Sequence, residues 1–208
     1  MNSAARLAKG IDVLGLALSQ ETQTRLLQYL VLIGKWNQVH NLTAIREPET
    51  MLVRHLLDSL SILSCIAGPR IVDVGSGAGL PGIPLALARP DWHVVLLESN
   101  HKKAAFLQQA RIELGLKNVE VAAERAENFR SPDGFDTVIS RAFSDLGDFV
   151  SLAGHLCAGG TGRLAAMKGI YPHEELKQLP AQFIVEKTLS IVVPGLGAKR
   201  HLVMIKHA

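Results

Sequence analysis

The segment from Arg70 to Pro84, R-I-V-D-V-G-S-G-A-G-L-P-G-I-P, constrains the fold more than any other part of the chain. Ile71, Val72 and Val74 form a short β-branched run that is typical of a buried parallel strand. Glycines follow at alternate positions, and a helix start comes after them. A strand, a glycine loop and a helix in this order bring a nucleotide-like ligand against bare backbone. The segment therefore predicts where a ligand binds.

From Arg70 onward, strand-like and helix-like segments alternate. The expected strands are 70–74, 93–98, 118–122, 135–140 and 163–168, and the expected helices are 81–89, 101–115 and 145–157. Such alternation indicates right-handed crossovers and a parallel sheet. Residues 183–193 and 201–207 are also strand-like, but the link between them is too short for a crossover helix. We expect them to pair as an antiparallel hairpin, which gives a mostly parallel sheet of seven strands.

Residues 1–66 are expected to form a helical N-terminal extension packed on a core of residues 67–208. Ser19 is a suitable N-cap for a helix with an apolar face from Leu26 to Trp36. Pro48 is expected to open a second helix, in which apolar residues continue at helical spacing to Leu63. Residues 1–20 contain no usable motif.

Composition limits the classes to which the chain can belong. It has 208 residues, of which 48% are hydrophobic, but no apolar run reaches the roughly 18 residues of a membrane span. No secretory signal is recognisable. We therefore expect a cytoplasmic protein that does not contact a membrane. We also expect a monomer, although the sequence does not reveal the oligomeric state. Cys65 and Cys157 are too few for a metal cluster, so no metal is expected. The net charge of +3 mildly favours a polyanionic partner.

Two ligands fit a loop built from Gly75, Gly77 and Gly79: a dinucleotide such as NAD, and S-adenosylmethionine (SAM). The glycines at 77, 79 and 82 satisfy the dinucleotide pattern G-x-G-x-x-G. However, Pro81 and Pro84 have no N–H to offer a pyrophosphate at the helix start. Because SAM has no phosphate, these prolines favour SAM.

Two acids and the C-terminal hairpin also favour SAM. Asp73 lies at the carboxyl end of the first strand, where it can face the methionine end of SAM or hold the loop by a hydrogen bond. Glu98 closes the second strand, where an acid binds ribose hydroxyls. The hairpin resembles the last two strands of class I SAM-dependent methyltransferases and is foreign to the ordinary dinucleotide sheet. We expect this Rossmann-like α/β fold.

The chain contains V-D-V-G-S-G-A-G-L-P-G-I-P, W-N-Q-V-H-N-L-T-A-I, V-R-H-L-L-D-S-L, V-I-S-R-A-F and R-H-L-V-M-I-K. Together these segments resemble the RsmG (GidB) family of bacterial small-subunit rRNA methyltransferases. The resemblance implies methyl transfer from SAM to N7 of one guanine, with 16S rRNA or the small ribosomal subunit as partner. It also implies cofactor contacts for Gly75 and Leu80, for Ala126 and Glu127 near the adenine, and for Arg141.

The expected reaction needs little acid–base chemistry. Guanine N7 carries a lone pair and no proton, so its attack on a methyl sulfonium requires no general base. The fourth strand ends in S-R-A-F, without the Asn-Pro-Pro-Tyr-type segment of amine methylation or a nucleophilic cysteine. Catalysis is therefore expected from proximity and alignment. Arg141 is the candidate catalytic residue, holding a phosphate or base edge, and Phe143 is a candidate base stacker.

Other residues are weaker candidates. His55 and Asp58, next to Arg54, are three residues apart on the second helix, and a salt link or cap on the helix face explains them more simply than a function. Asn41 lies in a turn near the expected pocket. Lys168 ends the fifth strand on the same edge as the glycine loop, which suggests an RNA or site contact.

The basic turn at 199–201 is either solvated loop charge or a contact with the RNA backbone; its residues are Lys199, Arg200 and His201. Three functions compete with rRNA methylation. They are methylation of another substrate on the same fold, dinucleotide-dependent oxidoreduction, and regulatory SAM binding without chemistry.

Overall fold

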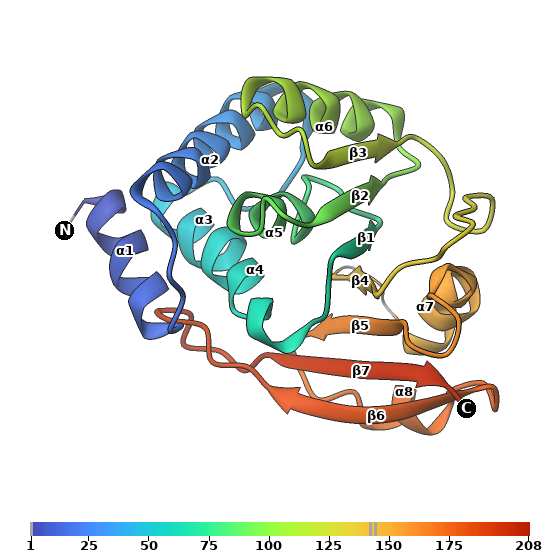
Figure 1. The fold of residues 1–208 in the computed structure, drawn as a ribbon. Coiled ribbons are helices and arrows are strands. Elements are labelled where there is room, and N and C mark those ends of the chain that lie inside the picture. Colours follow the sequence, from blue (N-terminus) through green and yellow to red (C-terminus); the bar gives the residue numbers. More distant parts are fainter. Residues whose placement is uncertain (1, 142, 144) are drawn as a thin grey trace.

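The computed structural model describes residues 2–141, 143 and 145–208. Its centre is a seven-stranded sheet in the order β3-β2-β1-β4-β5-β7-β6 (Figure 1). The strands are β1 Arg70–Val74, β2 His93–Leu97, β3 Val119–Ala122, β4 Thr137–Ser140, β5 Arg163–Lys168, β6 Phe183–Ser190 and β7 His201–His207. In this sheet β7 is antiparallel to both of its neighbours, and the other pairs are parallel. The predicted sheet and hairpin are confirmed.

Helices cover both faces of the sheet (Figure 1). Alternate residues of a strand point to opposite faces. On β1, Ile71 packs in a hydrophobic cluster with the N-terminal helices, α5 (Gly82–Ala88) and α6 (His101–Glu113). Val72 and Val74 pack in a second cluster with α7 (Leu146–Ala153), beside which lies α8 (His173–Lys177). This alternation turns Asp73 toward the face that α5 covers.

The N-terminal extension contributes to the first cluster. Its helix α2 (Gln20–His40) begins after Ser19, whose hydroxyl accepts the N–H of Thr22, as the sequence predicts. The preceding helix α1 (Ser3–Val13) was not predicted by any motif; it is capped by Asn2. Leu7, Leu26 and Tyr29 are fully buried against the rest of the cluster. The extension packs on the core, and the division of the chain at residue 66 stays a prediction.

The prediction of one regular helix from Pro48 to Leu63 is wrong. Pro48 does open a helix, but the segment divides into α3 Pro48–Met51, a π-helix Leu52–Leu57, α4 Asp58–Leu60 and a 3₁₀ turn Leu63–Cys65. The N–H of Asp58 bonds to the carbonyl of Val53, five residues before it, as in a π-helix. Apolar spacing does not reveal this wider turn, because an α-helix and a short π-helical stretch bury nearly the same positions.

Several elements are shorter than expected. The strand expected over 135–140 begins at Thr137, because Phe135 makes only an isolated bridge to Cys157. The strand expected over 183–193 ends at Ser190. The helix expected over 145–157 becomes 3₁₀ from Gly154. Within the described residues, no helix is long and apolar enough to cross a membrane.

Candidate functional site

The glycine loop follows β1 and turns sharply at the carboxyl edge of the sheet. Gly75, Gly77 and Gly79 have φ angles of 69°, 58° and 84°, in the region where glycine alone is free of strain. A Cβ on Gly75 would meet no atom of the described residues within 4 Å, whereas one on Gly79 would lie 2.5 Å from Cδ1 of Ile83. Gly75 therefore faces open space, and Gly79 lets α5 pack closely.

Asp73 lies beneath the loop. Its side chain is fully buried, and Oδ2 accepts the N–H of Gly82 at 2.9 Å. Among the described residues Oδ1 has no hydrogen-bond partner. Burial raises the pKa of Asp73 to about 7, although the Gly82 N–H and the Arg141 guanidinium act in the opposite direction. This geometry supports the role of holding the loop, and contact with the methionine end of SAM stays a prediction.

Glu98 is tied to the same loop. It follows β2, is 7% exposed, and its Oε2 accepts the N–H of Gly77 at 2.8 Å. Its Oε1 accepts the N–H of Asn100, also at 2.8 Å. A carboxylate oxygen accepts more than one hydrogen bond, so both oxygens retain capacity for ribose hydroxyls. Binding of the ribose by Glu98 stays a prediction.

A pocket of about 190 Å³, called here the loop pocket, opens beside Gly75. Ala126 and Glu127, from the segment after β3, line it together with Gly75, and their contact with the adenine of SAM stays a prediction. Gly77, Gly79 and Leu80 are not part of this lining.

Phe143 also belongs to the loop pocket, and its ring centroid is 5.3 Å from that of Phe149. The candidate base stacker therefore lies beside the predicted cofactor site and packs against α7.

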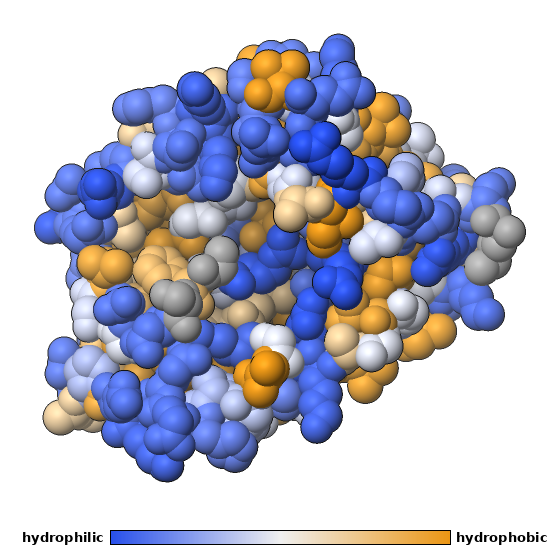
Figure 2. All heavy atoms as spheres, turned by 180° about the vertical axis from the view of Figure 1, so that it is seen from behind, coloured by the Kyte–Doolittle hydropathy of each residue, from blue (hydrophilic) through white to orange (hydrophobic). Residues whose placement is uncertain are grey.

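A second pocket, of about 360 Å³, lies where β4 and β5 end beside the N-terminal extension. It is called here the basic pocket because four cations, Arg54, Arg141, Lys168 and Arg200, line it with one carboxylate, Asp58. Seen from behind, the molecule is hollowed near the middle of its face (Figure 2). The structure thus brings together candidates that are far apart in the sequence.

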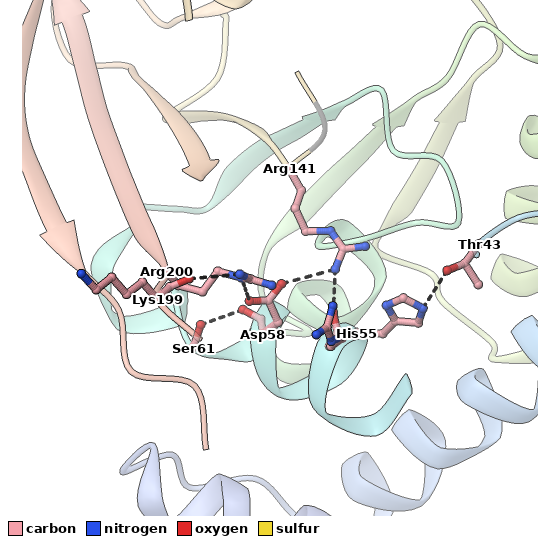
Figure 3. A network of polar contacts seen from close by, with 8 residues as sticks. Thr43, His55, Asp58, Ser61, Arg141, Lys199 and Arg200 are labelled. Atoms are coloured by element: carbon pink, nitrogen blue, oxygen red, sulfur yellow. Dashed lines mark hydrogen bonds and ion pairs between the residues drawn. The ribbon is translucent and has the colours of Figure 1, made fainter. Parts of the chain in front are cut away.

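Asp58 is the shared partner of two arginines in the basic pocket (Figure 3). Nε of Arg200 donates to its Oδ1 at 2.8 Å, and Nη1 of Arg141 lies 3.5 Å from its Oδ2. The same Nη1 donates to the carbonyl oxygen of Arg54 at 2.9 Å. The expected salt link on the helix face is therefore wrong, because the partners of Asp58 come from the sheet edge and the hairpin.

His55 points to another neighbour, with Nε2 3.2 Å from Oγ1 of Thr43. Burial and the nearby Arg141 lower the pKa of His55 to about 4, so the ring is neutral at pH 7. Asn41 ends α2 in a left-handed conformation, and its Oδ1 accepts a bond from Arg46 at 3.4 Å. It does not belong to the lining of the basic pocket.

Lys168 connects the two pockets. Its Nζ donates to the carbonyl of Phe143 at 3.1 Å and to Oε2 of Glu175 at 2.6 Å. The same Oε2 accepts the N–H of Leu146 at 2.8 Å, which ties Lys168 to the start of α7. Sequence reasoning missed Glu175, because nothing in its local pattern separates it from a surface acid of a short helix.

The residues of the basic turn before β7 contact different parts of the structure. Arg200 enters the basic pocket, whereas the ring of His201 lies 5.5 Å from that of Tyr171. The carbonyl of Lys199 accepts a bond from Nη1 of Arg200 at 3.1 Å. The described residues contain no group of three or more His, Cys, Asp or Glu placed to hold a metal ion.

Comparison with known proteins identifies close relatives. The sequence pattern of the family GidB, described as rRNA small subunit methyltransferase G, matches residues 22–203. A "Ribosomal RNA small subunit methyltransferase G" of Nitrosospira multiformis is 69% identical over 214 residues, covering 100% of this chain and 99% of the relative. One of the same name from Nitrosomonas eutropha is 53% identical, covering 99% and 98%.

Solved structures match the fold at low sequence identity. The O-methyltransferase TomG from Streptomyces achromogenes, solved in complex with SAM, has a TM-score of 0.57 and 18% identity, with 100% of both chains covered. A protein of the NADB-Rossmann superfamily from Streptococcus agalactiae has a TM-score of 0.59 and 16% identity, with 73% and 68% covered. With the observed strand order, these matches confirm the class I methyltransferase fold.

Proposed function

This chain belongs to the GidB family, rRNA small subunit methyltransferase G, and we propose that it transfers a methyl group from SAM to N7 of one guanine in 16S rRNA. The names of its relatives support the substrate and the class of reaction. The choice of N7 is supported by the chemistry of the two pockets.

The residues around the loop pocket fit SAM. The backbone of Gly75 faces space that a Cβ would fill, and Ala126 and Glu127 complete the lining on the side proposed for the adenine. We propose that Glu98, which accepts the Gly77 N–H, also receives the ribose hydroxyls, while Asp73 keeps the loop in shape through Gly82. When bound, SAM supplies an electrophilic methyl group on a positively charged sulfur.

The basic pocket fits a segment of RNA. Its four cationic side chains outnumber the two carboxylates that pair with them, Asp58 and Glu175, which leaves the pocket positively charged, as binding of phosphates requires. Arg141 directly follows β4 and lines the basic pocket, and its charge is close enough to Asp73 to lower the pKa of that acid. We propose that it fixes a phosphate or a base edge, so that N7 is held in line with the methyl group.

The observation that carries the N7 assignment is the lack of an available general base among the described residues of the basic pocket. Asp58 is held by two guanidiniums, and His55, with a pKa of about 4, is a weak proton acceptor at neutral pH. Methylation of an amine or a hydroxyl must remove a proton, whereas N7 attacks through a free lone pair. A pocket without an available general base therefore favours methylation at N7 over methylation of an amine or a hydroxyl.

The test is transfer from labelled SAM to small-subunit rRNA taken from cells that lack the protein. After digestion to nucleosides, mass spectrometry should find the label in 7-methylguanosine. Label in a different nucleoside would overturn the N7 assignment. Label in a small molecule but not in RNA would favour another substrate, and binding of NADH without binding of SAM would favour an oxidoreductase.

We also propose that the protein acts as a monomer in the cytoplasm, where bacterial rRNA is found, without a metal or a membrane partner. Gel filtration coupled to light scattering checks the monomer, and full activity after treatment with EDTA checks the independence from metal.

A further inference from the structure

The contacts of Asp58 exceed what a structural carboxylate in a helix requires. Asp58 belongs to the N-terminal extension, yet its partners Arg141 and Arg200 are 83 and 142 residues away. They come from the end of β4 and from the turn before β7, so three separate parts of the fold meet at one carboxylate (Figure 3). Its side chain is 3% exposed, whereas those of the arginines are 25% and 22% exposed.

We propose that Asp58 is a positioning residue for the transfer reaction: it holds Arg141 and Arg200 in the orientation in which they bind the RNA substrate. The inference rests on the proposed function of the basic pocket. It goes beyond it by giving the N-terminal extension a direct part in substrate binding.

The geometry separates Asp58 from the groups that touch RNA. Both of its oxygens face guanidiniums, its side chain is almost inaccessible, and a carboxylate repels phosphate. The arginines keep donors for a ligand. Among the described residues, Nε and Nη2 of Arg141 and Nη2 of Arg200 have no hydrogen-bond partner, and both side chains reach the surface of the pocket. Asp58 thus acts through the arginines.

The π-helix places Asp58 and completes the arrangement. In an α-helix the N–H of Asp58 would bond to the carbonyl of Arg54, four residues before it. Here that N–H bonds to the carbonyls of Val53 and His55, and the carbonyl of Arg54 accepts Nη1 of Arg141. One turn of the extension therefore holds Arg141 at two points, a carbonyl and a carboxylate. Short π-helical stretches are frequent at functional sites.

Removal of the charge of Asp58 distinguishes orientation of the arginines from a general effect of net charge on RNA binding. Asp58→Asn keeps the size of the side chain but removes one negative charge from a basic pocket. If charge alone governed RNA binding, the variant would bind RNA more tightly. If Asp58 orients the arginines, methyl transfer must fall although the protein has become more positive. The two explanations thus predict opposite signs.

The experiment compares wild type, Asp58→Asn, Arg200→Ala and the double variant in methyl transfer to undermethylated small-subunit RNA. We expect Asp58→Asn to lower kcat/KM at least about tenfold through weaker binding and alignment of RNA, with SAM affinity within about twofold of wild type. Glu186→Gln is the matched control. It also removes a carboxylate that pairs with an arginine, Arg163, but on β5 and β6 away from both pockets, and it should keep full activity.

Because Asp58 acts partly through Arg200, Asp58→Asn should lower kcat/KM by a smaller factor in the Arg200→Ala background than in wild type. Fully additive losses, an unchanged kcat/KM, or tighter RNA binding with faster transfer would each overturn the inference. An equal loss of SAM affinity would also overturn it, since that would indicate general damage to the fold. If Asp58→Asn fails to fold, Asp58→Glu, which keeps the charge but shifts the carboxylate, must show the same pattern.

The wild-type arm separates this inference from the proposed function. If wild type labels RNA at a position other than N7, the N7 assignment fails, and the comparison of variants still measures the role of Asp58 in transfer to that RNA. If wild type labels N7 and Asp58→Asn equals it, the inference alone fails.

Discussion

Replacement of Asp73 by asparagine isolates the effect of a buried acid beneath the glycine loop. The side chain of Asp73 is fully buried, and burial raises its pKa from 3.8 to about 7. Asparagine has nearly the same size, and its side-chain oxygen is able to accept the Gly82 N–H that Oδ2 of Asp73 accepts now. The substitution therefore removes the ionisation and keeps the loop contact.

The magnitude follows from the difference between the two pKa values. An acid whose pKa is higher in the folded state stabilises the fold while it is protonated, and this stabilisation is fully present below pH 3.8. It is lost as the pH rises toward about 7. At about 1.4 kcal/mol for each pH unit, the whole change amounts to about 4 kcal/mol.

Urea unfolding of wild type and Asp73→Asn between pH 4 and pH 8 measures this quantity. The free energy of unfolding of the variant, minus that of wild type, should rise by about 4 kcal/mol over this range. Any constant cost of burying the amide cancels from the change with pH, as do the other titrating groups. Parallel pH profiles for the two proteins would refute the reasoning.

The same variant decides between the two roles of Asp73. If Asp73 only holds the loop, calorimetric titration at pH 8 should give the variant nearly the SAM affinity of wild type. If its carboxylate faces the methionine end of SAM, the affinity should fall about tenfold or more, since an ion pair is lost.

Three further predictions concern the loop. Gly75→Val should lower SAM affinity at least about tenfold but lower the free energy of unfolding by only about 1–2 kcal/mol. The new Cβ meets open space in the free protein, and the cost to stability comes from the φ of 69°. Equal losses of binding energy in calorimetry and of stability in urea unfolding would argue against a ligand at Gly75. Tyr29→Phe should cost about 1–3 kcal/mol in urea unfolding, since the buried hydroxyl donates to the carbonyl of Ala78 in the loop; an unchanged midpoint would contradict this. Glu98→Gln replaces one of two backbone-accepting oxygens by a donor, so it should weaken SAM binding about tenfold, and unchanged affinity would remove Glu98 from the ribose site.

The fold could be predicted from local patterns because its signals are local. A β-branched run such as Ile71–Val74 reports a strand buried on both faces, and the short link between 190 and 201 excludes a crossover helix. The exact ends of strands, the helix α1 and the π-helix Leu52–Leu57 were beyond such patterns. Each of them is decided by which neighbours the segment packs against.

The loop pocket joins residues that were expected on two grounds: Gly75 from the strand and glycine pattern, and Ala126 and Glu127 from the family resemblance. Gly75, Ala126 and Glu127 all follow strands of one parallel sheet, and the carboxyl ends of parallel strands share an edge. The sequence does not show whether a residue at this edge contacts a ligand or holds the backbone, and Asp73 is an example. Its position was predicted, but its burial and its bond to Gly82 depend on how α5 packs.

The sequence by itself determined the parallel sheet, the closing hairpin, the glycine loop and the family, because spacing, β-branching and motif spelling are properties of neighbouring residues. Only the tertiary structure decided what Asp58 does. Its position on the helix predicts a salt link or a cap on the helix face, yet it pairs with Arg141 and Arg200, which are 83 and 142 residues away. Contacts over such separations arise from packing of whole elements, and no local pattern carries them.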